Sequence, residues 1–332
     1  MAPKAPTVLL TNDDGPPNAR ESPYVFGLYQ HLTQTLGWNV KVVLPSSQKS
    51  WIGKAYHINE VTKGTYFYPK ALDGAGEVSV TSRPLKDGEI AEWILLDGTP
   101  ATCANVALHN LFPGQIDLVV SGPNLGRNSS SAFALSSGTI GAALSASLSQ
   151  TRSIAISYGT VLHPTPTTFF EPAHILGIRI INYLWGNWGK DEGGLREDEV
   201  DLYNVNIPLI QGLLTEESLK ICWTTMWRKP YGRLFKRLET SDLVKDSSSA
   251  AGPDAPAISG DSGVNRPSGL LFRWSPNMEG LIRPPESSLP VGSDGWAIHK
   301  GWVSVTPLCA TFAEPPHPEV QDIEEKVWKM KL

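Results

Sequence analysis

Residues 7–18, TVLLTNDDGPPN, place two adjacent carboxylates directly after a short apolar run. The run 7–10 is typical of a buried strand, and the Gly-Pro-Pro that follows the acids indicates a turn. Adjacent like charges repel each other, so a pair of acids at a strand end favours a bound cation. The plainer alternative is a solvated turn in which Asn12 or Asp13 bonds its own backbone, and on this stretch alone that alternative is the better one.

Apolar runs alternate with helix-like segments through the first half of the chain. The pattern predicts further strands at 40–45, 116–122 and 153–159, and helices at 23–36, 99–111, 138–148 and 169–185. Thr99 as N-cap and Pro100 at the first position form a typical helix start. Strands that alternate with helices predict an α/β fold with a mostly parallel sheet covered on both faces. Ligands of such sheets bind beyond the carboxyl ends of the strands, which is where Asp13 and Asp14 lie.

The rest of the chain has weaker patterns. Segments 77–84 and 91–96 flank a Lys-Asp-Gly turn and indicate a hairpin or a similar excursion. Strands are also predicted within 203–208, 220–227 and 301–308. Residues 241–269 are rich in Ser, Gly, Pro and Asp and are predicted to be a flexible insertion, whereas 315–332 is predicted to be an amphipathic C-terminal helix. We find no internal repeat and interpret 1–332 as a single domain.

The composition narrows the class of protein. With 332 residues, of which 41% are hydrophobic, the chain can form a sizeable core. A net charge of -5 argues against a nucleic-acid scaffold or a polybasic membrane surface. The 3 cysteines are too few and scattered for a disulfide framework or a zinc cluster, and we interpret them as buried thiols. We see neither a signal peptide nor a membrane-spanning stretch, so we expect a cytoplasmic protein.

Four polar segments stand at predicted strand ends: TNDDG (11–15), PSSQKSWIG (45–53), SGPNLGRN (121–128) and SSGTIGAA (136–143). Taken singly, most of them are ordinary loops or turns, and the last could merely cap a helix. Taken together, two carboxylates, a Ser hydroxyl and an Asn carbonyl form an all-oxygen set. Such a set suits Mg²⁺, Mn²⁺ or Ca²⁺ and would hold zinc or copper poorly. Four protein ligands leave about two positions open on an octahedral ion.

The segment 136–143 complements these donors. Ser137, Gly138 and Thr139 precede a predicted helix, so backbone N–H groups and the positive end of the helix dipole would face the same region. This arrangement predicts an anion site beside a cation site. It has neither the Walker pattern nor a Gly-x-Gly-x-x-Gly fingerprint, which disfavours P-loop ATP hydrolysis and dinucleotide binding.

The motifs LLTNDDG (9–15), DGTPATC (97–103), VVSGPNLGRN (119–128) and SSGTIGAALSA (136–146) resemble, in order and approximate spacing, those of the SurE (survival protein E) family of metal-dependent nucleotidases and phosphatases. The segment 301–308, GWVSVTPL, resembles the last core strand of that family. The resemblance is dense over residues 7–156 and thin over the remainder. Four motifs in order are far more specific than any one alone.

The resemblance implies a set of roles. The metal ligands would be Asp13, Asp14, Ser50 and Asn124, and the phosphate ligands would be Ser137, Gly138 and Thr139 together with Asn128. It also implies a three-layer α/β/α Rossmann-like sandwich with a C-terminal β excursion used for oligomer contacts, and hence a homodimer or homotetramer. The extra length suggests a eukaryotic, fungal-like branch.

Three departures from the family pattern stand out. Thr102 replaces the usual acid of the family's GTPADC motif, a loss we expect to affect stability more than chemistry. Trp51 and Lys54 flank Gly53, and we interpret Lys54 as solvated rather than phosphate-binding. Third, the insertion and extra length make the second half hard to compare with the family.

These motifs do not predict the group to which the phosphate of the substrate is attached. Trp51, Tyr231 or Trp274 could stack on a base. Because the chain holds 11 tryptophans and most must be core, none of the three is favoured.

These residues lead to a functional hypothesis. A divalent ion would activate a water that attacks a phosphomonoester. One of the two aspartates would orient or deprotonate this water, and we favour Asp13 over Asp14. We expect a nucleotidase acting on nucleoside monophosphates, with broader acid phosphatase or exopolyphosphatase activity open, and we expect His57 and His299 to be structural or surface residues. The alternative is a non-catalytic phosphate-binding module. A dehalogenase-type aspartyl phosphatase is disfavoured because its two acids stand two positions apart.

Overall fold

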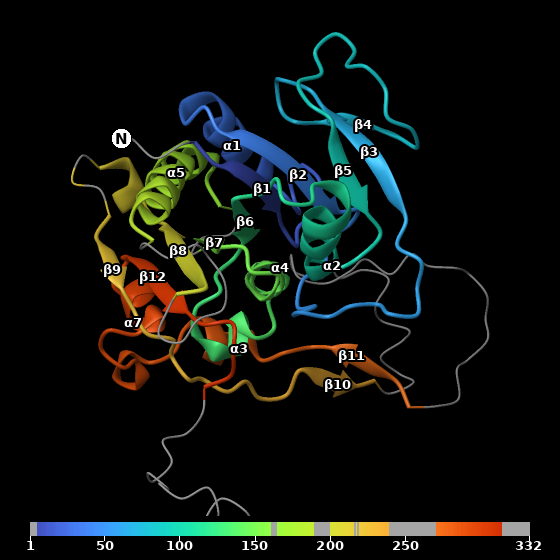
Figure 1. Ribbon diagram of the computed structural model, residues 1–332. Helices are drawn as coiled ribbons and strands as arrows, with labels where there is room; N and C mark the ends of the chain where they lie inside the picture. The colour runs from blue at the N-terminus through green and yellow to red at the C-terminus, as the bar shows by residue number, and fades with distance from the viewer. Residues whose placement is uncertain are drawn as a thin grey trace, which may run out of the picture.

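A ten-stranded sheet in the order β4-β3-β5-β2-β1-β6-β7-β8-β12-β9 runs through this computed structural model (Figure 1). The structure describes residues 5–160, 165–188, 200–215, 217, 219–238 and 270–313. The strands of the sheet are β1 (Thr7–Thr11), β2 (Asn39–Pro45), β3 (Gly64–Pro69), β4 (Gly76–Ser79), β5 (Trp93–Leu96), β6 (Leu118–Leu125), β7 (Ser153–Thr160), β8 (Leu202–Leu209), β9 (Ile221–Trp223) and β12 (Val303–Leu308). From β5 to β8 all neighbouring pairs are parallel, as predicted.

Alternating residues of β1 show how helices cover both faces of the sheet. Val8 and Leu10 belong to a core cluster with residues of α1 (Val25–Gln30) and α5 (Phe170–Gly186). Leu9, which points the other way, packs with residues of α2 (Pro100–Val106) and α4 (Gly138–Leu148). The three-layer α/β/α sandwich with a mostly parallel sheet is therefore confirmed.

The helix boundaries follow local chemistry. At the start of α2 the Thr99 hydroxyl oxygen accepts a hydrogen bond of 3.1 Å from the Thr102 backbone N–H, and Pro100 occupies the first turn, as predicted. The helices α1 and α2 each continue into a π-helical turn, η1 (His31–Thr35) and η2 (Ala107–Leu111). The remaining helical segments are α3 (Ser130–Ala134), η3 (Thr167–Phe169), η4 (Gln211–Leu214), α6 (Met278–Ile282), η5 (Glu286–Ser288) and α7 (Asp294–His299).

One edge of the sheet differs from the prediction. The strands β4 and β5 do not pair with each other, because β3 lies between them and pairs antiparallel with both. The segment 64–69, GTYFYP, had not been identified as a strand, although Phe67 and Tyr68 are buried in it. The predicted strand at 220–227 is only the short β9, with β12 parallel beside it.

A separate two-stranded antiparallel sheet is formed by β10 (Phe235–Arg237) and β11 (Phe272–Trp274), which run below α3 in Figure 1. The predicted insertion at 241–269 and the predicted helix at 315–332 lie outside the described residues. Within the described parts of the chain, no helix has both the length and the apolar character needed to cross a bilayer.

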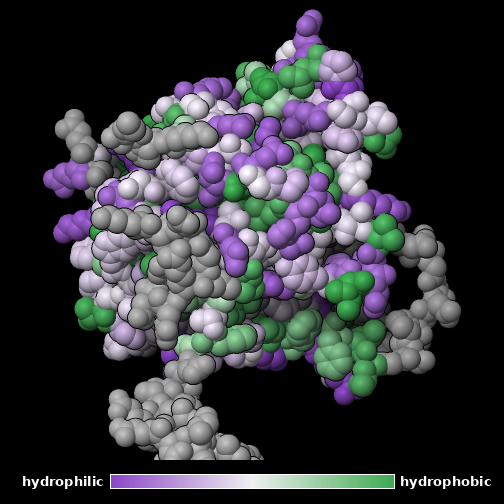
Figure 2. Space-filling view, in the orientation of Figure 1, coloured by the Kyte–Doolittle hydropathy of each residue, from purple (hydrophilic) through white to green (hydrophobic). Residues whose placement is uncertain are grey.

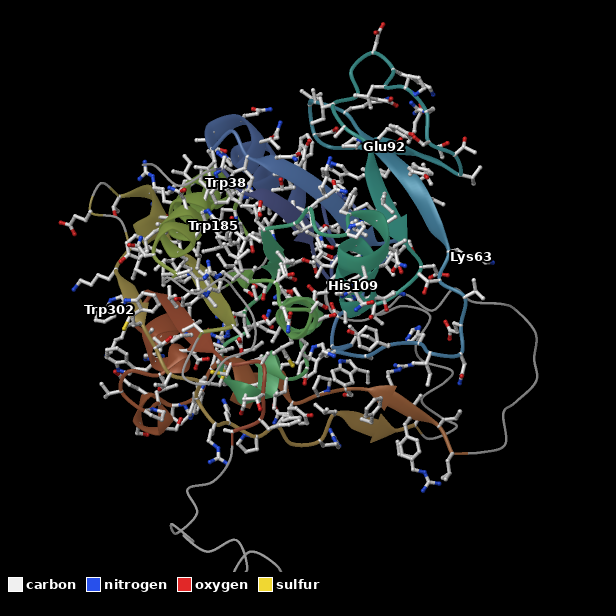
Figure 3. All side chains as sticks on the ribbon, in the orientation of Figure 1. Trp38, Lys63, Glu92, His109, Trp185 and Trp302 are labelled. Carbon is white, nitrogen blue, oxygen red and sulfur yellow. The ribbon has the colours of Figure 1, made fainter. Side chains whose placement is uncertain are left out.

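The cysteines and tryptophans occupy mixed environments. Cys103 is buried as expected, but Cys222 is half-buried and Cys309 is exposed, so the expectation of three buried thiols is wrong. Trp38 and Trp185, the latter on α5, contact the core on that face, whereas Trp302 lies lower in the view, at its left edge (Figure 3).

Candidate functional site

The turn after β1 holds two buried acids. The Asn12 side-chain amide donates to the Gly15 carbonyl oxygen at 2.9 Å, and the Gly15 N–H donates back to the Asn12 side-chain oxygen at 2.9 Å. Gly15 has φ +86, a left-handed conformation that glycine adopts without strain. Asp13 and Asp14 are each only 3% exposed. The alternative was right that Asn12 bonds the backbone of the turn, and wrong that the turn is solvated, because both acids are buried.

The N-terminus of α4 packs directly on Asp13. The Thr139 hydroxyl donates a hydrogen bond of 2.6 Å to Oδ1 of Asp13. A side chain at Gly138 would not fit, because its Cβ would lie 2.8 Å from the Cβ of Asp13. The first turn of this helix and the first of the two acids are thus held in one rigid arrangement.

Asp14 is held by β6, the neighbouring strand. Its Oδ2 accepts a hydrogen bond of 2.8 Å from the Leu125 backbone N–H. The register of β6 with β7 shifts between Ser121 and Asn124, an irregularity that re-aims the end of the strand. Asn124, the predicted amide ligand, is the residue immediately before the one that contacts Asp14.

The loop that carries Ser50 lies between the β1 turn and α4. The Lys49 N–H donates to the Asp13 carbonyl oxygen at 2.7 Å, and the Gly53 N–H donates to the Ser136 carbonyl oxygen at 2.9 Å. Ser50 itself is half-buried. The backbone therefore brings together the segments of all four predicted metal ligands, Asp13, Asp14, Ser50 and Asn124.

The predicted phosphate ligands at α4 have defined local roles. Ser137 is the N-cap, and its hydroxyl oxygen accepts a bond of 3.2 Å from the Ile140 N–H. The Thr139 hydroxyl is engaged by Asp13. Among the described residues, the backbone N–H groups of Gly138 and Thr139 have no hydrogen-bond partner. The Thr139 hydroxyl proton is donated to Asp13, whereas the Ser137 hydroxyl acts as an acceptor toward Ile140 and keeps its proton for another partner. The donors that an anion would meet are therefore these two N–H groups and the Ser137 hydroxyl.

Asn128 belongs to a buried polar network that the sequence did not reveal. Its side-chain amide donates to Ser157 Oγ at 2.9 Å, and its backbone N–H donates to Asn206 Oδ1 at 2.7 Å. The Asn204 amide donates to the Asn128 carbonyl oxygen at 2.8 Å. The signal was present in the predicted strand YNVNIP, where two asparagines alternate along an otherwise apolar run.

Asp294 is a buried acid that the sequence did not single out. It is 0% exposed and accepts hydrogen bonds from the backbone N–H groups of Ser130 at 2.7 Å, Trp227 at 3.0 Å and Gly295 at 2.7 Å. Burial raises its pKa, while these donors act in the opposite direction. Ser130 has φ +72, so the carboxylate holds a left-handed residue two positions after Asn128.

The donor chemistry fits a hard divalent ion. The described residues contain no cluster of three or more His, Cys, Asp and Glu side chains. What converges instead are the segments of two carboxylates, a hydroxyl and an amide, all oxygen donors. The two histidines considered in the sequence lie in exposed contacts with glutamates, His57 with Glu60 at 3.3 Å and His299 with Glu286 at 3.8 Å.

Comparisons with known proteins agree with the resemblance. Residues 8–233, more than half of the chain, match the family model described as Survival protein SurE. A Saccharomyces cerevisiae protein named probable tubulin--tyrosine ligase PBY1 is 32% identical over 93% of this chain, which spans only 42% of that protein's length. The 5'-nucleotidase SurE of Desulfovibrio desulfuricans is 28% identical, with 92% of this chain and 94% of that protein covered.

A solved structure shows the same fold. The crystal structure of the SurE protein from Aquifex aeolicus aligns with a TM-score of 0.57 and 22% identity over 93% of this chain and 95% of that chain. The yeast match is consistent with the expected fungal-like branch. With the family model spanning the β1 turn, the Ser50 loop, the β6 end and α4, this chain is a member of the SurE (survival protein E) family.

Proposed function

We propose that this protein is a divalent-metal-dependent phosphomonoester hydrolase that releases phosphate from nucleoside monophosphates. One observation carries the proposal: Asp13 and Asp14 are adjacent and buried at the end of β1, and Asp13 contacts the N-terminus of α4 through the Thr139 hydroxyl. The acids that would bind a cation are thereby in direct contact with the helix N-terminus that would bind an anion. Family membership and relatives named 5'-nucleotidase support the same reaction class.

The acids and their neighbours would hold the ion. Asp13, Asp14, Ser50 and Asn124 are the proposed ligands, and Mg²⁺ or Mn²⁺ is the ion we expect, with Ca²⁺ able to occupy the same donors. When bound, such an ion supplies an activated water and polarises a phosphate oxygen. The Thr139 hydroxyl bond fixes the Asp13 carboxylate. This restraint supports Asp13 as the residue that orients or deprotonates the attacking water.

The start of α4 would bind the phosphate. The N–H groups of Gly138 and Thr139 and the positive end of the helix dipole favour the negative charge that the equatorial oxygens carry. Asn128, held by β7 and β8, is the proposed additional phosphate ligand. Fixed donors of this kind need no reorganisation as the transition state forms.

The proposal is tested by phosphate release from AMP, glycerol 2-phosphate and polyphosphate with Mg²⁺, with Mn²⁺ and in EDTA. We expect turnover of the monoesters only with metal, and a rise in Tm on adding Mn²⁺ to metal-stripped protein. Asp14→Asn should abolish both effects, while Asp87→Asn, a change in an exposed loop, should preserve them. Equal turnover in EDTA would exclude the metal mechanism. Phosphate binding without turnover under any metal would identify the non-catalytic module instead.

A further inference from the structure

Four aromatic rings from distant parts of the chain meet beside the proposed site. The Trp51 ring centroid lies 5.0 Å from that of Trp274, 5.8 Å from that of Phe133 and 6.2 Å from that of Tyr231. The interplanar angles of 59°, 62° and 67° are those of tilted or edge contacts. We call these four residues the Trp51 cluster. From the sequence, Trp51, Tyr231 and Trp274 were named as residues that could stack on a base, but none was favoured because most of the 11 tryptophans must be core.

The Trp51 cluster adjoins the proposed metal and phosphate donors along the backbone. Trp51 directly follows Ser50, and Phe133 lies in α3, between Asn128 and Ser137. Ile52 reaches the other way: its Cγ2 would lie 3.0 Å from a Cβ placed on Gly138. One loop thus joins the start of α4 to the aromatic rings.

The backbone at Trp51 is unusual. Its φ of +61 is left-handed, a conformation that costs a non-glycine residue about 1 kcal/mol or more. Gly53, two residues later, has the same φ of +61. These two left-handed residues turn the chain within the Ser50 loop, directly after the proposed metal donor.

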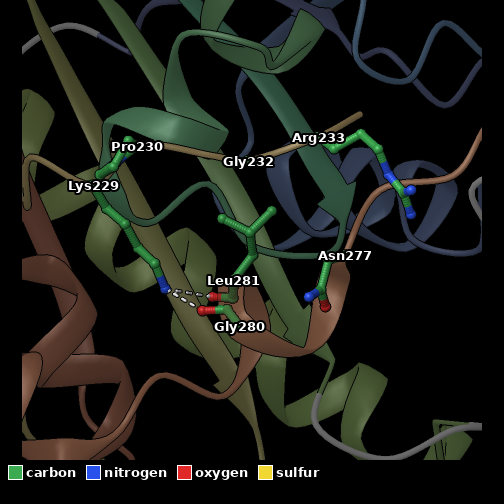
Figure 4. Close-up of a pocket in the computed structure, with 7 residues that line it drawn as sticks. All are labelled: Lys229, Pro230, Gly232, Arg233, Asn277, Gly280 and Leu281. Atoms are coloured by element: carbon green, nitrogen blue, oxygen red, sulfur yellow. Dashed lines mark hydrogen bonds between the residues drawn. The ribbon is translucent and has the colours of Figure 1, made fainter. Parts of the chain in front are cut away.

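The Trp51 cluster is open to solvent, unlike the aromatic core. Tyr231 is 44% exposed and Trp51 and Trp274 are half-buried, whereas Trp93 in the core is 1% exposed. Apolar surface is visible around the two-stranded sheet of β10 and β11 in Figure 2. Beside Tyr231, an open pocket of about 510 Å³ is lined by its neighbours Pro230 and Gly232 and by residues of α6 (Figure 4).

We propose that the Trp51 cluster binds the base of the nucleotide substrate by stacking, with Trp51 as the main specificity-determining residue. The inference rests on the proposed function, because it places the base next to the phosphate and metal sites. Half-exposed aromatic rings offer faces on which any planar base stacks, with little dependence on its hydrogen-bonding edge. The preference would therefore be for monoesters that carry a planar ring, purines ahead of the smaller pyrimidines.

The test compares AMP with glycerol 2-phosphate, which has no planar ring, under the same divalent metal. We expect Trp51→Ala to raise KM for AMP by roughly 5- to 100-fold with little change in kcat, and to leave kcat/KM for glycerol 2-phosphate close to wild type. Trp51→Phe should restore most of the affinity for AMP. Tyr231→Ala, at a position 44% exposed, gives a second variant that tests the cluster with less risk to folding.

Tyr183→Ala is the matched control, since Tyr183 is 59% exposed on α5 and outside the cluster. An equal loss on both substrates in Trp51→Ala and Tyr231→Ala would show that the rings only anchor the two-stranded sheet of β10 and β11, and would overturn the proposal. An unchanged KM for AMP in these variants would also overturn it. So would a wild-type protein that hydrolyses glycerol 2-phosphate but does not hydrolyse AMP. If wild type hydrolyses neither ester, the proposed function fails, and calorimetric binding of AMP to wild type and to Trp51→Ala then decides the inference separately.

Discussion

Glu89 at the β3–β5 edge and Asp13 at the end of β1 are both buried acids, but they are held differently. Both Glu89 carboxylate oxygens accept hydrogen bonds of 2.7 Å from the Arg83 guanidinium, which itself stacks on Tyr68 at 3.8 Å. The Asp13 and Asp14 contacts described above come from a hydroxyl and a backbone N–H. A carboxylate with a structural role is enclosed by the protein's own cation. The donors described for the acids after β1 include a hydroxyl and a backbone N–H, and these acids lie at the carboxyl end of the parallel strands, where we propose that the ion binds.

The largest expected effect comes from Asp13→Asn. This change should lower kcat/KM for AMP by at least about 100-fold, because the variant loses a proposed metal ligand and the group that orients the water. Folding should be retained, since the Thr139 hydroxyl can still donate to an amide oxygen. Steady-state kinetics and circular dichroism provide the two readouts. Activity within a few-fold of wild type would remove Asp13 from the site and break the contrast with Glu89.

Glu89→Gln should have the opposite pattern. Arg83 holds the pKa of Glu89 at about 2, so the carboxylate is charged in the folded protein at all ordinary pH values. Its replacement leaves a guanidinium facing a neutral amide, and we expect a lower Tm with kcat and KM for AMP unchanged. Glu77→Gln, an exposed neighbour in the same ion-pair group, should shift Tm much less. A loss of activity without a loss of Tm would show that the two regions are not functionally distinct.

Asp294→Asn falls between these two cases. An amide cannot accept at both positions, so one of the Ser130 and Trp227 N–H groups loses its partner, at a cost of about 1–3 kcal/mol. Because Ser130 lies two residues after Asn128, a proposed phosphate ligand, we also expect KM for AMP to rise. Asp201→Asn is the control. Asp201 likewise accepts a hydrogen bond from a backbone N–H, that of Ala310 at 2.7 Å, but it lies just before the start of β8, away from the carboxyl ends of the strands. A raised KM in both variants would mean that general destabilisation is responsible.

A smaller, pH-dependent effect is expected from His174. Burial, with a smaller contribution from His31, lowers its pKa from 6.5 to about 3, and its Nδ1 is 3.0 Å from the Tyr158 hydroxyl. Below pH 6.5 the His174 imidazole binds a proton in the unfolded chain but not in the folded protein. The free energy of unfolding is therefore highest above that pH and falls as the pH decreases. At pH 5.5 the loss should be about 1.4 kcal/mol. Urea unfolding of wild type and His174→Gln at pH 7.5 and 5.5 measures it, and an equal pH dependence in both would exclude His174 as the cause.

What the sequence predicted well depended on local signals. The Thr99 and Ser137 caps, the short apolar strands and the position of Asp13 at a strand end are all readable within a few residues. Parallel topology then predicts that strand ends meet. Pairings between distant segments have no such signal: β3 between β4 and β5, Asp294 with Ser130, and Trp51 with Trp274 depend on tertiary packing.

The position of β12 has a consequence for synthesis of the chain. All eight residues of β8 are buried, and β12, from the end of the described chain, pairs along one side of it. While the ribosome is still adding residues 210–302, β8 is paired with β7 on one side only, and its other side presents unpaired backbone N–H and C=O groups. A nascent chain stalled in this interval would therefore be prone to aggregate. We expect it to need a chaperone until β12 leaves the ribosome, although the turn with Asp13 and Asp14 is synthesised much earlier.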